Sequence, residues 1–238
     1  MLLSEEYRYF DGDQPLLGYL SYDRMIDEPR PAVIVIHDWS GRNQFACEQA
    51  DHLAKLGYVA FALDMFGGGL VAASNEEKQT LIEPFLTDRS KLLQRVNAAY
   101  NVVRELRQVN RRYIAVIGFC FGGLCALDLA RSGADICAAV SFHGLLDGSN
   151  LVAAKPISAK LLVLHGYEDP MVSEQQLSNF YDEMTTAGVD WQIHMYGKTL
   201  HAFTNPAAND YQLGTVFNEL AARRSWQAMT SFLQEVFL

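Results

Sequence analysis

The sequence lacks the features that would place the protein in a membrane or outside the cell. No apolar run approaches the roughly 20 residues that a transmembrane helix needs. The first residues, Met1–Glu6, lack the basic region followed by an apolar run that marks a signal peptide. There are only four cysteines and no two of them have CxxC spacing, so we expect reduced intracellular thiols and no disulfide framework. These absences predict a soluble cytoplasmic protein with no membrane partner.

Positive charge is also scarce. The chain has 19 Lys and Arg against 28 Asp and Glu, a net charge of −9. A protein that binds a nucleic-acid backbone needs a basic face, so we expect no nucleic acid as a partner. No pair of histidines has a metal-ligand spacing such as HExxH, and we expect no metal.

Length and composition favour one globular domain. Half of the 238 residues are apolar and a fifth are charged, which is an ordinary globular balance. No internal repeat, low-complexity tract or Pro-rich linker divides the chain, so we predict a single domain over residues 1–238. Residues 64–86 contain three consecutive glycines and Pro84. We expect this segment to be an excursion from the main fold or a partial lid.

Short apolar runs alternate with helical patterns along the chain. The expected strands are residues 33–36, 58–63, 113–117, 138–142, 160–164 and 191–196. The expected helices are residues 88–107, 124–131, 174–187 and a segment that Asn43 caps and Gly57 ends. Such alternation produces βαβ units. It predicts an α/β fold with a mostly parallel central sheet and helices on both faces.

A glycine-rich turn follows the strand at 113–117. Its sequence runs from Gly118 to Gly123 with Cys120 inside it, and a helical pattern opens at Leu124. This strand–turn–helix setting is typical of a nucleophile elbow, with cysteine in place of the commoner serine. The thiol would lie at a helix N-terminus, which favours a thiolate, and the backbone N–H of Phe121 would bind an oxyanion. The alternative is a buried cysteine in a glycine-rich turn.

A nucleophilic cysteine needs a base, and the base needs an acid that orients it. Asp169 follows the strand ending at Leu164, and His201 follows the last expected strand. The chain order of nucleophile, acid and histidine is that of the α/β-hydrolases. Glu168 is a competing acid, but Pro170 favours a turn at Asp169.

Other residues are candidates for the surroundings of this site. The loop after the first central strand would supply a second oxyanion donor, the backbone N–H of Trp39, and Asp38 would tune the thiol or His201. Four further side chains cluster around the motifs as candidates for a substrate pocket, namely Phe66, Phe119, His143 and Phe203.

These residues resemble the dienelactone hydrolase (carboxymethylenebutenolidase) family of α/β-hydrolases. The matching pieces are the loop 37–41, the segment 62–67, the GxCxGG elbow, the HGxxD loop and the His-Ala-Phe turn. The resemblance implies hydrolysis of an ester or lactone through a thioester, without a cofactor or metal. It implies Cys120 as nucleophile, His201 as base and Asp169 as the residue that orients it.

Two positions depart from the family pattern. The family's best-known members have a glutamate at the position of Asp38 and an arginine, which binds a substrate carboxylate, at the position of Asn205. A second substrate-binding arginine has no clear counterpart in residues 75–89, where Lys78 is the nearest candidate. A neutral ester or lactone of a small organic acid is therefore the expected substrate, and the expected assembly is a monomer or weak homo-oligomer.

Two other functions remain open from the sequence. One is a ligand-binding or sensor protein that keeps the hydrolase pocket without turnover. The other is a thiol-based redox protein that uses Cys120, although the chain offers no CxxC partner to resolve its oxidised form.

Overall fold

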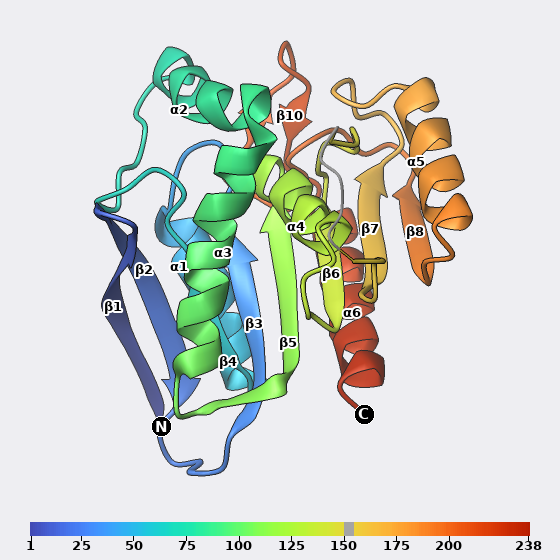
Figure 1. Cartoon of the computed structure of the whole chain (residues 1–238). Coiled ribbons are helices and arrows are strands. Elements are labelled where there is room, and N and C mark those ends of the chain that lie inside the picture. The colour runs from blue at the N-terminus through green and yellow to red at the C-terminus, as the bar shows by residue number, and fades with distance from the viewer. Residues whose placement is uncertain (150–154) are drawn as a thin grey trace. The chain divides into compact units, whose positions relative to one another are not determined.

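The computed structural model describes residues 1–149 and 155–238, and these fall into two compact units, Met1–Ile117 and Gly118–Leu238 (Figure 1). No helix among the described residues is both long enough and apolar enough to cross a membrane. Each unit is built on strands with helices packed against them.

The first unit contains strands in the order β1-β2-β4-β3-β5. Their bounds are Leu2–Asp11 (β1), Gln14–Asp23 (β2), Arg30–Ile36 (β3), Val59–Ala62 (β4) and Val109–Phe119 (β5), the last continuing two residues beyond the unit. β1 and β2 form an antiparallel hairpin, β2 pairs antiparallel with β4, and β3 pairs parallel with β4. β4 and the apolar part of β3 are fully buried, which explains their continuous apolar sequence.

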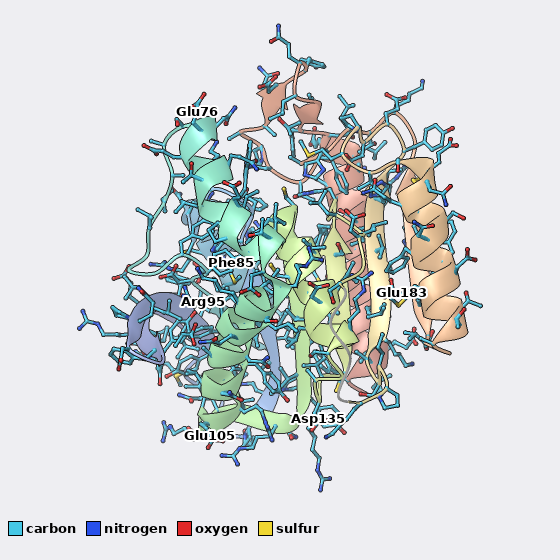
Figure 2. The ribbon with its side chains drawn as sticks, turned by 45° about the horizontal axis from the view of Figure 1, so that its top comes forward. Glu76, Phe85, Arg95, Glu105, Asp135 and Glu183 are labelled. Atoms are coloured by element: carbon cyan, nitrogen blue, oxygen red, sulfur yellow. The ribbon has the colours of Figure 1, made fainter. Side chains whose placement is uncertain are left out.

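Helices cover both faces of this unit's strands. They are α1 (Gln44–Lys55), α2 (Asn75–Thr87) and α3 (Arg89–Glu105). Figure 1 shows α3 in front of the strands and α1 behind them. The side chain of Asn43 caps α1, and that of Asp88 caps α3. Arg95 connects α3 to two other elements of this unit. It forms an ion pair with Asp11 of β1, and its guanidinium lies 5.7 Å from the ring centroid of Phe85 in α2 (Figure 2).

The second unit contains three parallel strands in the order β6-β7-β8. Their bounds are Ala138–Phe142 (β6), Lys160–Gly166 (β7) and Trp191–Tyr196 (β8). A short antiparallel pair lies farther along the chain, β9 (Asn209–Asp210) and β10 (Thr215–Val216). The helices are α4 (Phe121–Arg131), α5 (Glu174–Thr186) and α6 (Glu219–Val236), and Figure 1 shows α4 in front of β6 and α6 behind it.

A buried arginine joins two of the second unit's helices. Arg131 at the end of α4 donates to both carboxylate oxygens of Glu183 in α5, at 2.9 and 2.8 Å, and Figure 2 labels Glu183 on that helix. The same guanidinium donates to the backbone carbonyls of Leu146 and Asp147. Residues 146 and 147, which follow β6, are therefore held against α4 by the same side chain that binds α5.

The predicted fold class is confirmed, since all six expected strands and all four expected helices are present. The N-terminal hairpin β1–β2 and helix α2 were not predicted. Residues 64–86, the expected excursion, begin with a loop whose backbone N–H groups at Phe66, Gly67 and Gly69 donate to the buried carboxylate of Asp64. α2 then follows in the same unit.

Candidate active site

Cys120 occupies a strained turn between β5 and α4. Its φ of 54° and ψ of −117° are rare for a residue with a side chain. The turn is tight enough that a Cβ on Gly118 would lie 1.9 Å from the carbonyl oxygen of Gly122, and one on Gly123 would lie 2.5 Å from Oγ of Ser141. Close packing therefore requires glycine at positions 118 and 123 of the GxCxGG sequence, as an elbow needs.

The surrounding backbone fixes the elbow and favours negative charge at its tip. The N–H of Cys120 donates to the carbonyl of Phe142 at the end of β6, at 3.0 Å, and its own carbonyl accepts from the N–H of Gly123 at 2.9 Å. Phe121 is the first residue of α4. The first N–H groups of a helix have no acceptor within the helix and carry its positive dipole end, so an anion is stabilised here. The half-buried thiol of Cys120 lies at this position.

His201 and Asp169 form a buried pair. Nδ1 of His201 lies 2.8 Å from Oδ2 of Asp169, and the other carboxylate oxygen accepts from the N–H of Met171 at 2.9 Å. The backbone of His201 is held on both sides, because its N–H donates to Gly214 and its carbonyl accepts from Val216. Glu168, the competing acid, is exposed. Of the two candidate acids, the structure brings Asp169 to His201.

The charges around His201 favour its protonated form. Burial by itself lowers the pKa of His201, but the negative charge of the Cys120 thiolate and the hydrogen bond to Asp169 outweigh burial and raise this pKa to about 10. Since Nδ1 is engaged by Asp169, Nε2 is the atom left to exchange a proton with Cys120. The arrangement suits a protonated His201.

His143, a pocket candidate from the sequence, lies beside His201. Their ring centroids are 5.1 Å apart, and Nε2 of His143 lies 2.7 Å from Oγ1 of Thr204. Burial, and next the charge on His201, lowers the pKa of His143 well below its usual range. Burial likewise lowers the pKa of His165, which follows Leu164 in β7. Both side chains are therefore neutral at neutral pH.

The aromatic candidates in this unit pack around His143. Phe119 stacks on Phe142 with ring centroids 4.8 Å apart, and Phe203 meets His143 edge-on at 5.1 Å. Both rings are fully buried. Asn205 is half-buried, and its amide oxygen accepts from the N–H of Ala207, so it stabilises a turn four residues after His201.

The remaining candidates belong to the first unit. The Asp38 carboxylate accepts from the N–H of Ser40 at 2.8 Å, and the Trp39 ring lies under Nζ of Lys78, 5.2 Å from it. Nδ1 of His37 donates to the carbonyl of Asp38, and its Nε2 accepts from the N–H of Met65 at 3.1 Å. Phe66 packs on the His37 ring. The roles of Asp38 and Trp39 toward Cys120 stay predictions.

Backbone strain in the described part of the chain is concentrated at these segments. The residues other than glycine with positive φ are Cys120, His143, Lys198 and Ala202. Three of them are at or next to the cysteine and the two histidines, and Lys198 is in the loop leading to His201. Such conformations cost free energy, and they cluster at functional sites because function retains them. No group of three His, Cys, Asp or Glu side chains in residues 1–149 and 155–238 is arranged to hold a metal ion.

Comparisons with known proteins identify the family of the chain. The model of the dienelactone hydrolase family matches residues 18–237. A probable 2-oxo-3-(5-oxofuran-2-ylidene)propanoate lactonase of Bradyrhizobium is 30% identical over 214 residues, which cover 86% of this chain and 83% of that protein. An uncharacterized protein of Caenorhabditis elegans is 36% identical over 155 residues, or 63% of this chain and 98% of that protein.

A solved structure extends the similarity to the whole fold. The crystal structure of a dienelactone hydrolase-like promiscuous phosphotriesterase from metagenomic libraries is 35% identical, with a TM-score of 0.95 over 100% of this chain and 99% of that one. The chain belongs to the dienelactone hydrolase family, and it is a carboxylic ester or lactone hydrolase with the α/β-hydrolase fold.

Proposed function

We propose that the protein hydrolyses an ester or lactone of a small organic acid through a thioester on Cys120. In this proposal His201 is the base and Asp169 orients it. The observation that carries the proposal is the 2.8 Å contact of His201 with Asp169 in a histidine whose pKa is raised by the Cys120 thiolate and by Asp169. Covalent catalysis of this kind requires a nucleophile that interacts with a base and an acid that orients the base, and His201 interacts with both Cys120 and Asp169.

The first half of the reaction forms the thioester. The Cys120 thiolate attacks the carbonyl carbon, and the N–H of Phe121 holds the oxygen that becomes negative. When the tetrahedral intermediate collapses, the C–O bond to the leaving group breaks and the alkoxide takes a proton from Nε2 of His201. With a lactone, the new hydroxyl stays attached to the acyl group.

The second half releases the acid. Nε2 of His201 takes a proton from water, the water oxygen attacks the thioester carbon, and the C–S bond breaks to restore the Cys120 thiolate. The Asp169 carboxylate stabilises the imidazolium in both halves, because it accepts from Nδ1 throughout. The proposal assigns the second oxyanion donor to the N–H of Trp39 and the tuning of the thiol to Asp38, in line with the family resemblance.

A neutral substrate suits the residues near His201. Asn205 stands where family members use an arginine, and its amide oxygen is already engaged by the N–H of Ala207. The net charge of −9 adds a field that opposes anions. We therefore propose a neutral ester or lactone over one that carries a free carboxylate.

Phosphotriesters are a second candidate substrate class. The relative of known structure with 35% identity is described as a promiscuous phosphotriesterase, and its fold covers this chain completely. The same thiolate would then attack phosphorus, and the P–O bond to the leaving group would break as that oxygen takes a proton from Nε2 of His201. Water, deprotonated by Nε2, would next attack phosphorus and break the P–S bond to restore the thiolate. A triester such as paraoxon belongs in the substrate panel for this reason.

The test combines turnover with trapping of the covalent intermediate. Cys120→Ala should lower turnover of p-nitrophenyl acetate by roughly 10³-fold or more, since a nucleophile cannot be replaced by its neighbours. Acid quenching of the wild-type reaction followed by intact-mass measurement should show one added acetyl group, which is absent from Cys120→Ala. Cys137→Ala is the matched control, because Cys137 is also half-buried in the same unit. Full activity in Cys120→Ala would refute the proposal.

The same panel separates the two alternatives. A ligand-binding protein would show saturable binding and no turnover of any ester, lactone or phosphotriester. A redox protein would form a mixed disulfide at Cys120 with peroxide and a thiol, and would not acquire an acyl group.

A further inference from the structure

The peptide unit between Phe142 and His143 joins two parts of the proposed catalytic machinery. The carbonyl of Phe142 accepts from the N–H of Cys120 at 3.0 Å, and the N–H of His143 donates to the carbonyl of Leu164 at 2.8 Å. Leu164 lies in β7, five residues before Asp169. The backbone at the end of β6 is therefore bonded both to the nucleophile and to the strand that leads to the acid.

The side chain of His143 reaches the third part, the loop that carries His201. Its Nε2 lies 2.7 Å from Oγ1 of Thr204, and its ring lies 5.1 Å from the rings of both His201 and Phe203. His143 thus contacts three residues of the segment 201–204. The His143 side chain itself is buried, with 2% of its surface exposed.

The backbone of His143 is strained, with a φ of 39°. Glycine would adopt this conformation without the penalty that a Cβ brings. A histidine at such a position points to a use for its side chain that outweighs the strain. The contacts with Thr204 and His201 identify that use.

Several titratable groups face one another here. His201 interacts with Cys120 from the elbow, with Asp169 from the loop after β7, and with His143 from the end of β6, while His165 of β7 interacts with His143 and His201. Burial keeps His143 and His165 neutral, so they place no positive charge beside the His201 imidazolium. A neutral, hydrogen-bonded side chain can hold His201 without opposing its charge.

We propose that His143 is a positioning residue, which through Thr204 holds the His201 loop so that Nε2 of His201 stays directed at Cys120. The assignment rests on the proposed cysteine mechanism. His143 touches no reacting atom in it. It acts by fixing the base relative to the nucleophile, a placement on which the rate of proton transfer depends strongly.

The test removes the hydrogen bond between His143 and Thr204, first at Thr204, which is the less buried of the two residues. Thr204→Val keeps the shape of the side chain but loses Oγ1, and His143→Leu removes the imidazole. Each should lower kcat for p-nitrophenyl acetate by roughly 10- to 100-fold with little change in KM, because the base is misplaced while substrate binding is retained. The double variant should cost about as much as either single one, since both break the same contact.

A second readout separates positioning from a loss of stability. The rate at which iodoacetamide alkylates the Cys120 thiol should reach half its maximum at a higher pH in Thr204→Val, because the imidazolium no longer stabilises the thiolate as well. Thr204→Ser restores the hydroxyl and should return most of kcat and the original alkylation profile. Thr230→Val is the matched control, since it removes a hydroxyl that donates to the carbonyl of Trp226 within α6.

The outcomes are decisive in either direction. If Thr204→Val lowers only the midpoint of urea unfolding and leaves kcat and the alkylation profile as in Thr230→Val, His143 is a structural residue and the proposal is wrong. If His143→Leu does not fold, Thr204→Val still decides. Full activity in Cys120→Ala would instead overturn the proposed cysteine mechanism. The alkylation profile of Thr204→Val would still test the placement of His201 beside Cys120, because alkylation does not depend on turnover.

Discussion

Gly166 and Thr199 bring the acid and the histidine loops together. A Cβ on Gly166, at the end of β7, would lie 2.4 Å from the carbonyl oxygen of Thr199, so only glycine allows this approach. Two residues farther on, the N–H of Glu168 donates to the same carbonyl at 3.0 Å. The contact fixes the start of the Asp169 loop against the residues that precede His201. The glycine of the HGxxD sequence thereby helps to set the 2.8 Å bond between Asp169 and His201.

Gly166→Ala should therefore reduce both stability and activity. The added methyl group meets backbone and not a flexible side chain, so the two loops must separate. We expect a loss of about 1–3 kcal/mol in the free energy of unfolding, as for other overpacked sites, and a fall in kcat larger than any change in KM. Urea unfolding and steady-state kinetics measure the two effects.

Gly197→Ala is the matched control for this substitution. Gly197 lies in the exposed turn after β8, and a Cβ there would meet nothing within 4 Å. It should keep wild-type kinetics. If Gly166→Ala behaves like Gly197→Ala, the close approach does not set the geometry of the acid and the histidine.

Asp169→Asn should impair catalysis with little change in shape. An amide cannot stabilise an imidazolium as a carboxylate does, and it can favour the wrong tautomer of His201, so kcat should fall by roughly 10²- to 10⁴-fold. The kinetics of Glu168→Gln provide the comparison, because Glu168 is the neighbouring acid on the same loop and is exposed. A larger loss in Glu168→Gln than in Asp169→Asn would reverse the assignment of the acid.

The sequence predicted those parts of the fold whose pattern is local and strong. β4 and residues 32–36 of β3 are continuous apolar runs, and β6 is apolar except for Ser141, because these residues are buried. The hairpin β1–β2 was not predicted because five of the ten residues of β1 are exposed and four are charged, so the strand lacks a clear apolar pattern. Helix α2 was not predicted because Pro84 lies within it. Its start could have been recognised, since Ser74 and Glu77 form a capping box.

The candidate site was predictable to the extent that its residues lie in recognisable turns. The spacing of strand, glycines and cysteine made Cys120 a candidate nucleophile, and the order along the chain made Asp169 and His201 candidates for the acid and the base. The contact between His143 and Thr204 was not predictable, because it joins residues 61 positions apart and depends on side-chain orientation. The hydrogen bond from the N–H of Ala207 to the Asn205 amide oxygen was also not predictable, because it depends on the conformation of the turn.

Asn205→Arg should shift substrate preference toward anions. The position lies in the turn four residues after His201, and a guanidinium there would attract a carboxylate on the acyl part of the substrate. We expect KM for an ester with a free carboxylate to fall by roughly tenfold at low salt, with the gain shrinking as salt is added. KM for p-nitrophenyl acetate should change little.

Asn205→Asp provides the opposite charge at the same position, and it can still accept from the N–H of Ala207. It should raise KM for the anionic ester and leave that for p-nitrophenyl acetate nearly unchanged. Equal responses of both substrates to both variants would mean that residue 205 does not face the acyl group.

Stability should fall as the solution is made acidic, because three histidines are buried in their neutral forms. Burial is the largest cause that lowers the pKa of His37, His143 and His165. In the unfolded chain a histidine has a pKa of about 6.5, so below this pH the unfolded state binds protons that the folded state does not. Each such histidine lowers the free energy of unfolding by up to about 1.4 kcal/mol per pH unit below pH 6.5.

His201 has the opposite sign and a different pH range. Its folded pKa is raised to about 10, so its contribution to stability is complete below the unfolded value and is lost as the pH rises toward 10. Between about pH 7.5 and 6.5, acidification therefore increases the contribution of His201 while the neutral histidines begin to lose theirs. Urea unfolding between about pH 6 and 5, where the His201 contribution is nearly complete, reports mainly the neutral histidines. His37→Gln tests the origin of the slope, because an amide can still donate to the carbonyl of Asp38 and accept from the N–H of Met65. This variant should lose about a third of the slope, since one of three proton-linked groups is gone. An unchanged slope would show that the acid sensitivity arises from other groups.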